Sequence, residues 1–137
     1  MVRVLVDTGP LVALLNARDR AHLRVDKFMA GFRGEMLTTW AVLAETCHLL
    51  PRHLVVQFMH WAAAGGVQLR EVPPFAMADI AAAMEKYADR PMDLADASLI
   101  WLASSSGITE VLTLDKADFG AYRLPDGRRL RNLLAGQ

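Results

Sequence analysis

Acidic side chains stand at four separated places along the chain, each beside apolar sequence. Asp7 ends an apolar run that starts at Val2, and Asp115 ends a second such run. Glu45 and Asp96 lie in segments with helical spacing and mostly apolar neighbours. A carboxylate among apolar residues is costly unless it is paired or bound to a metal, and hard oxygen ligands select Mg²⁺ or Mn²⁺ over zinc. The pattern indicates a divalent-metal site.

Some of these acids also have an ordinary structural interpretation. Asp7 can cap the helix that starts at the next residue, and Asp93 can cap the helix that contains Asp96. For Asp93 we favour the cap, and for Asp118 we favour a place in a surface loop. Capping alone does not explain acids at two strand ends and on two helix faces. The metal site therefore remains the better explanation of the set.

The elements that must position these acids follow from the hydrophobic pattern. Short apolar runs, which predict strands, alternate with segments of helical spacing. The predicted strands are 2–6, 36–38, 67–72, 111–114 and 122–124. This alternation predicts an α/β fold in which helices cover both faces of a central, mostly parallel sheet of about five strands. Ligands bind such sheets at the carboxyl ends of strands, where Asp7 and Asp115 stand.

The helices are predicted from their caps and stop signals. In the second helix, Asp19 is the candidate N-cap and Leu23 lies on the apolar side. Thr38 or Thr39 caps the third, in which Trp40 contributes to an apolar face around Glu45. Gly107 ends the last long helix. The predicted helices run from residue 8 to about 15, and over about 20–32, 39–50, 53–64, 75–87 and 94–105.

Length and composition limit the class of protein. The 137 residues are expected to form one domain, 1–137, and 53% hydrophobic with 22% charged residues supports a folded core. One cysteine, Cys47, excludes an internal disulfide framework and favours a reducing compartment. No apolar run reaches the length of a membrane span, and the N-terminus has no signal-peptide layout. We expect a cytoplasmic protein without membrane contact.

The distribution of charge bears on partners. The net charge is zero, but residues 1–33 and 116–137 are basic while 34–115 are acidic. Twelve of the 15 basic residues are arginines, which suit bidentate contacts with phosphate. A polyanion-binding protein with metal-bound acids fits this pattern, and so does an ordinary solvated surface. The basic residues expected to flank the acids are Arg18, Arg20, Arg24, Lys27, Lys116, Arg123, Arg128, Arg129 and Arg131.

Four short motifs occur in order over essentially the whole chain. They are Val6-Asp7-Thr8-Gly9-Pro10-Leu11, Ala44-Glu45-Thr46, Leu94-Ala95-Asp96-Ala97-Ser98-Leu99, and Leu112-Thr113-Leu114-Asp115 with Asp118-Phe119. Each is weak alone, but together they are specific. With these motifs the chain resembles the PIN-domain ribonucleases, and most closely the VapC-type toxins of prokaryotic toxin–antitoxin pairs.

The resemblance implies a PIN-like three-layer α/β/α sandwich and a metal-dependent endoribonuclease that hydrolyses RNA phosphodiester bonds. It implies Mg²⁺ or Mn²⁺ as cofactor, a cognate antitoxin whose C-terminal segment blocks the site, and a homodimer. The implied metal-binding and catalytic residues are Asp7, Glu45, Asp96 and Asp115, with Asp93, Thr113 and Asp118 as possible accessory residues. Trp40, His53, Val56, Phe58 and Trp61 lie on consecutive helices, where they form either a partner surface or part of the core.

Other classes of function remain to be separated by experiment. The same fold can serve a non-toxin RNA-processing nuclease or a catalytically silent module that binds RNA or protein. A signalling receiver domain is disfavoured because Pro73 and Pro74, and no acid, follow the strand 67–72. A phosphatase of the DxD type is excluded because position 9 is Gly9. Zinc and nucleotide-cofactor motifs are absent from the sequence.

Overall fold

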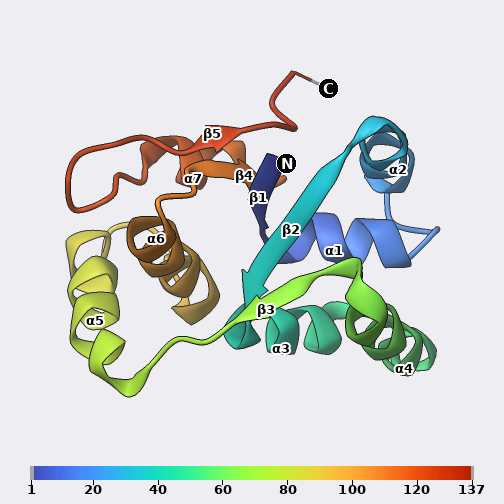
Figure 1. The fold of residues 1–137 in the computed structure, drawn as a ribbon, viewed down its shortest axis with the longest axis horizontal. Coiled ribbons are helices and arrows are strands. Elements are labelled where there is room, and N and C mark those ends of the chain that lie inside the picture. The colour runs from blue at the N-terminus through green and yellow to red at the C-terminus, as the bar shows by residue number, and fades with distance from the viewer. Residues whose placement is uncertain (1, 137) are drawn as a thin grey trace.

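A five-stranded parallel sheet, in the order β3-β2-β1-β4-β5, organises the protein. The structure is a computed structural model that describes residues 2–136 (Figure 1). The strands are β1 (Val2–Val6), β2 (Gly34–Thr39), β3 (Gln68–Arg70), β4 (Glu110–Leu112) and β5 (Arg131–Asn132). The helices are α1 (Thr8–Leu15), α2 (His22–Gly31), α3 (Trp40–Leu49), α4 (Arg52–Trp61), α5 (Met77–Lys86), α6 (Leu94–Ser106) and α7 (Lys116–Ala121).

The strand order places a change of direction at the centre of the sheet. From β1 the chain builds outward through β2 to β3, and it then returns past β1 to build β4 and β5 on the other side. Right-handed crossovers consequently place α1 to α4 on one face and α5 to α7 on the other (Figure 1). The predicted α/β sandwich is confirmed. In open α/β sheets, ligands bind at such a reversal, outside the carboxyl ends of the strands. We call this position, beyond the ends of β1 and β4, the central crevice.

The core runs through the middle strands. Val4, Leu5 and Val6 are all buried, as expected of a strand with helices on both faces. Leu37 on β2 and Leu112 on β4 are also fully or almost fully buried beside them. Full burial of one such side chain stabilises the fold by about 1.5–3 kcal/mol relative to exposure. The central strand is thereby the most firmly held part of the sheet.

The structure confirms two of the helix boundaries that the sequence predicts. Thr39 caps α3, with its hydroxyl accepting a hydrogen bond from the Val42 N–H at 3.3 Å. Gly107 ends α6 in the left-handed conformation at φ 77°. A bilayer-crossing helix is not found anywhere in residues 2–136, because none is both long and apolar enough.

Some expectations about the helices are wrong. Asp19 does not cap α2: its carboxylate accepts from the Ala21 N–H at 2.9 Å and closes the turn before the helix. Leu23 is 81% exposed, and Val25 is the buried residue of that helix. Trp40 is 55% exposed, so the face around Glu45 is less apolar than the sequence indicated.

The C-terminal strand also differs from prediction. Residues 122–124 form no strand; Arg123 makes an isolated antiparallel bridge to Arg129 across a turn. The fifth strand is β5, which pairs with β4 in the register Glu110 with Arg131 and Val111 with Asn132. The error arose because the apolar run 122–124 resembles a short strand, whereas Tyr122 and Leu124 are buried in the core from a turn.

Candidate active site

Asp7 lies at the central crevice of the sheet. Its N–H continues the ladder from β1 by donating to the Leu112 carbonyl at 3.0 Å. Its side chain is buried and makes no cap hydrogen bond to α1, so the capping interpretation of this residue is wrong. Instead its carboxylate accepts from the Thr113 hydroxyl at 2.9 Å. Burial raises the pKa of Asp7 to about 6, partly offset by the Thr8 backbone N–H and by the Thr113 hydroxyl.

Thr113 and Asp115 follow β4 on the other side of the crevice. While the Thr113 hydroxyl donates to Asp7, its oxygen accepts from the Asp115 N–H at 3.0 Å. The Asp115 carboxylate caps α7 by accepting from the Asp118 N–H at 3.1 Å. Burial and the neighbouring carboxylate of Asp118 raise the pKa of Asp115. Thr113 thus connects the two acids that follow β1 and β4.

Two further acids come from the start of α6. Asp93 caps the helix, as predicted, by accepting from the Asp96 N–H at 2.8 Å. The Asp96 carboxylate accepts from the Tyr122 hydroxyl at 3.1 Å. Burial, together with the charges of Asp7 and Asp93, raises the pKa of Asp96 to about 7. The electrostatic interaction with Asp7 shows that α6 brings its acids to the crevice.

Glu45 completes the set from α3, which packs against α6. Burial raises its pKa, and so do the carboxylates of Asp93 and Asp7. Beside it lies the buried Thr8 hydroxyl, which lowers the pKa of Glu45 in part and makes no hydrogen bond of ordinary geometry within residues 2–136. The structure therefore brings Asp7, Glu45, Asp96 and Asp115, with Asp93, into one electrostatically coupled cluster. Their roles in catalysis stay a prediction.

Asp118 is not a surface-loop residue. It lies in α7 with its side chain 15% exposed, and its carboxylate pairs with the Arg90 guanidinium at 3.0 Å. Arg90 also lowers the pKa of Asp115, although burial outweighs that effect. Sequence reasoning missed both Arg90 and Tyr122. They lie 28 and 26 residues from the acids they contact, and no local pattern connects them.

The cluster fits a hydrated divalent cation. Four mutually repelling carboxylates with raised pKa values are stabilised by a nearby positive charge, and the buried Thr8 hydroxyl beside Glu45 offers a further oxygen. Within residues 2–136, no three His, Cys, Asp or Glu side chains form a ready-made cage for a metal ion. Mg²⁺ usually keeps several waters and takes only one or two carboxylates directly. The donor set suits that mode of binding.

Comparison with known proteins agrees with this geometry. The family model of the PIN domain matches residues 4–123, which include every acid of the cluster. The chain belongs to the PIN domain family. This PIN domain is 25% identical over 130 residues to "Ribonuclease VapC26" of Mycobacterium tuberculosis, covering 92% of this chain and 96% of that protein. Its fold is similar to that of VapC20 of the same organism, whose structure is titled a sarcin–ricin loop cleaving toxin. The TM-score is 0.72 at 24% sequence identity, and the match covers 83% of this chain and 91% of VapC20.

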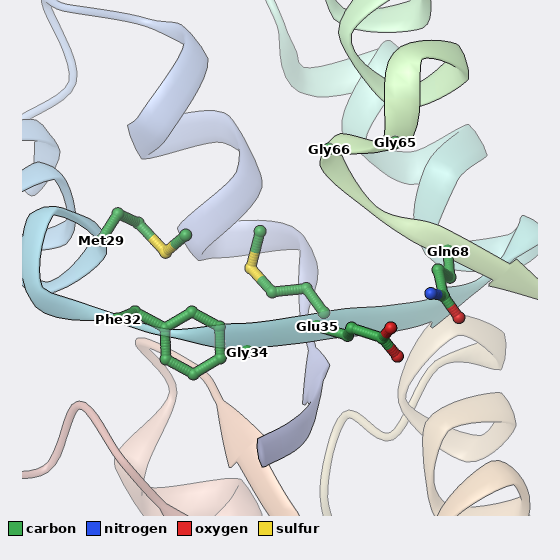
Figure 2. A pocket seen from close by; sticks show the side chains of 8 residues that line it. Met29, Phe32, Gly34, Glu35, Gly65, Gly66 and Gln68 are labelled. Carbon is green, nitrogen blue, oxygen red and sulfur yellow. The ribbon is translucent and has the colours of Figure 1, made fainter. Parts of the chain in front are cut away.

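A second hollow lies at the opposite edge of the sheet. Figure 2 shows Met29, Phe32, Glu35 and Gln68 around a pocket of about 160 Å³ at the amino ends of β2 and β3. Gly66 closes it, and a methyl group there would lie 2.2 Å from the Trp61 ring. The walls are methionine, phenylalanine and glycine, with one carboxylate and one amide. The pocket lacks the converging polar groups found beyond the carboxyl ends of the strands. We call that end of the sheet the carboxyl edge, and the end at which the pocket lies the amino edge.

Proposed function

We propose that this PIN domain is a divalent-metal-dependent endoribonuclease of the VapC type, and that it is the toxin of a toxin–antitoxin pair. The carrying observation is the coupled cluster of Asp7, Glu45, Asp96 and Asp115 at the central crevice of a PIN fold. The similarity to Ribonuclease VapC26 over 92% of the chain supports RNA as the substrate.

In the proposed mechanism, each residue has a part in hydrolysing a phosphodiester bond. Asp7, Asp96 and Asp115 would hold Mg²⁺ or Mn²⁺, directly or through water. The metal, when bound, supplies a positive charge that polarises a phosphate oxygen and stabilises the leaving 3′ oxygen. Glu45 would position the attacking water and accept its proton, because burial and the carboxylates of Asp93 and Asp7 raise its pKa and make it a stronger base than an exposed glutamate. Thr113 would fix the orientation of Asp7.

The structure divides the basic residues expected to contact RNA. Arg24 donates to the Leu134 carbonyl, and Arg123 to the Gly120 and Tyr122 carbonyls, so both guanidinium groups already serve the fold. Arg128 and Arg131 pair with the carboxylates of Asp126 and Glu110. In residues 2–136, no ion pair or side-chain hydrogen bond engages the side chains of Arg18, Arg20, Lys27 or Arg129. We assign the remaining phosphate contacts to these four.

The proposed partners have a candidate surface on α3 and α4. Trp40 and Val56 are 55% and 65% exposed, whereas Phe58 is fully buried and belongs to the core. An exposed apolar face of this kind is suited to a homodimer or to an antitoxin. Sedimentation equilibrium of the purified chain should give the mass of a dimer, and a monomer that cleaves RNA would contradict the dimer.

A cleavage assay tests the activity itself. Purified protein should cut single-stranded or looped RNA with Mg²⁺ or Mn²⁺, and excess EDTA should stop the reaction. RNA that stays intact under both metals would favour the catalytically silent binding module. Induced expression in a bacterial host separates the remaining alternatives, because a toxin arrests growth and a processing nuclease does not.

A further inference from the structure

Asn132, on the last strand, makes hydrogen bonds to both the N–H and the carbonyl of Thr113. The Asn132 side-chain oxygen accepts from the Thr113 N–H at 3.2 Å, and its amide nitrogen donates to the Thr113 carbonyl at 3.1 Å. The same oxygen also accepts from the Leu134 N–H at 3.1 Å. One partly buried side chain therefore makes three hydrogen bonds, two of them to a single residue.

These contacts occur where the regular sheet stops. β4 ends at Leu112, and the last backbone bond between the two strands runs from the Leu133 N–H to the Val111 carbonyl at 2.9 Å. Without a further backbone partner, the Thr113 peptide groups at this position would be left unpaired. The Asn132 amide, which offers one donor and one acceptor, extends the ladder by one residue.

Thr113 is the residue whose orientation the acids depend on. Its hydroxyl donates to the Asp7 carboxylate at 2.9 Å and accepts from the Asp115 N–H at 3.0 Å. A rotation of the Thr113 backbone would break both bonds. Partners that orient a metal-binding side chain typically change metal affinity or activity about 10–100-fold when removed.

We propose that Asn132 is a positioning residue of the active site, which acts through Thr113 to fix Asp7 and Asp115. It lies beyond residues 4–123, the part of the chain that matches the PIN family model. The inference rests on the proposed metal-dependent activity. It assigns a role to the final strand that the set of acids alone does not suggest.

A double-mutant cycle tests this role. The variants are Asn132→Ala, Thr113→Val and the two combined, measured for RNA cleavage and for Mn²⁺ affinity by calorimetry without RNA. Asn132→Ala should lower kcat and Mn²⁺ affinity about 10-fold, with little change in KM for RNA. Because both residues act through one path, the combined variant should be no worse than Thr113→Val alone.

The other asparagine of the chain gives a matched control. Asn16 also accepts from a backbone N–H, that of Arg18 at 3.1 Å, but on an exposed loop after α1. Asn16→Ala should leave kcat and Mn²⁺ affinity within twofold of the native values.

Each outcome of the cycle decides the inference. Near-native kcat and Mn²⁺ affinity in Asn132→Ala would overturn it, and so would effects that simply add in the combined variant. Native protein that cuts no RNA would refute the proposed function. In that case the Mn²⁺ affinities of the native protein and the three variants would still test the role of Asn132. Native protein that binds no Mn²⁺ would overturn the role given to Asn132.

Discussion

The carboxyl edge and the amino edge of the sheet are lined by different kinds of residue. At the carboxyl edge, buried polar groups meet: Asp7 with Thr113, Thr38 with the Val6 carbonyl at 2.8 Å, and Thr39 with Ser98 at 2.7 Å. At the amino edge, the pocket in Figure 2 is lined largely by methionine, phenylalanine and glycine. The carboxylates of Asp7, Glu45, Asp96 and Asp115, whose pKa values burial raises, belong to the first of these edges.

The difference indicates which end of the sheet lowers the free energy of unfolding. Carboxylates that repel one another, here around the buried Asp7, lower the free energy of unfolding whenever they are ionised without a cation. At the amino edge, the close contact between Gly66 and the Trp61 ring contributes to stability instead. Changes at the carboxyl edge should therefore alter activity more than stability, and changes at the amino edge the reverse.

The largest effect is expected from Asp7→Asn. Cleavage should fall below detection, because the substitution removes a buried carboxylate from the proposed metal site. The fold should persist, since asparagine has nearly the same shape and carries no charge to bury. Cleavage assays and circular dichroism measure both properties.

A matched change at the amino edge is Glu35→Gln, which should leave cleavage unchanged. Retained activity in a clean preparation of Asp7→Asn would refute the assignment of this residue.

Next in size is the response of stability to pH without metal. The pKa values of Asp7 and Asp96, about 6 and about 7, lie above their usual 3.8. Between those limits the folded protein binds more protons than the unfolded chain, so stability falls as pH rises from 4 to 8. For Asp7 the loss is about 3 kcal/mol at most, from about two pKa units of about 1.4 kcal/mol each.

Thermal unfolding in EDTA at pH 5 and pH 8 measures this loss. Mg²⁺ should restore most of the stability at pH 8, and Asp7→Asn should show a smaller dependence on pH. A native protein that is equally stable at both pH values would contradict the raised pKa values.

Gly66→Ala tests the amino edge. The added methyl group would lie 2.2 Å from the Trp61 ring, and such overpacking costs about 1–3 kcal/mol. Denaturant unfolding should show this loss, while cleavage per folded molecule stays native. Gly31→Ala is the control, because nothing lies within 4 Å of the position its methyl group would take. A variant at Gly66 that folds normally but loses activity would break the contrast between the edges.

The smallest effect is expected from Tyr122→Phe, which removes the hydroxyl that donates to Asp96 but keeps the ring. One lost hydrogen bond of about 0.5–1.5 kcal/mol corresponds to a fall in kcat of about 2–10-fold. Tyr87→Phe is the control: the Tyr87 hydroxyl accepts from the Arg123 N–H at 2.8 Å, and its ring packs on Tyr122 with centroids 5.1 Å apart. Equal losses of kcat in both variants would show that the Asp96 contact has no special effect.

The sequence predicted those features that local pattern controls. The apolar run that forms β1, the Thr39 cap and the Gly107 stop are signals carried by a few neighbouring residues, and the structure confirms them. The convergence of the acids was also predictable, because parallel strands end at one edge. Leu23 and Trp40 were placed wrongly, since helical spacing alone does not say which part of a face meets the sheet.

The supporting residues of the site could not be predicted. Tyr122, Arg90 and Asn132 contact the cluster from 19 to 28 residues away along the chain. Their types are common and carry no spacing signal, and only the packed fold brings them near the acids. The sequence could thus name the acids and Thr113, but not Tyr122, Arg90 or Asn132.

The guanidinium of Arg24 reaches across 110 residues to the Leu134 carbonyl and anchors the tail of the protein near α2. A chain trimmed to residues 4–123 would retain every acid of the cluster yet lose this anchor and β5. Shortened versions of the domain should therefore keep the segment that follows residue 123, and an affinity tag is better placed at the N-terminus.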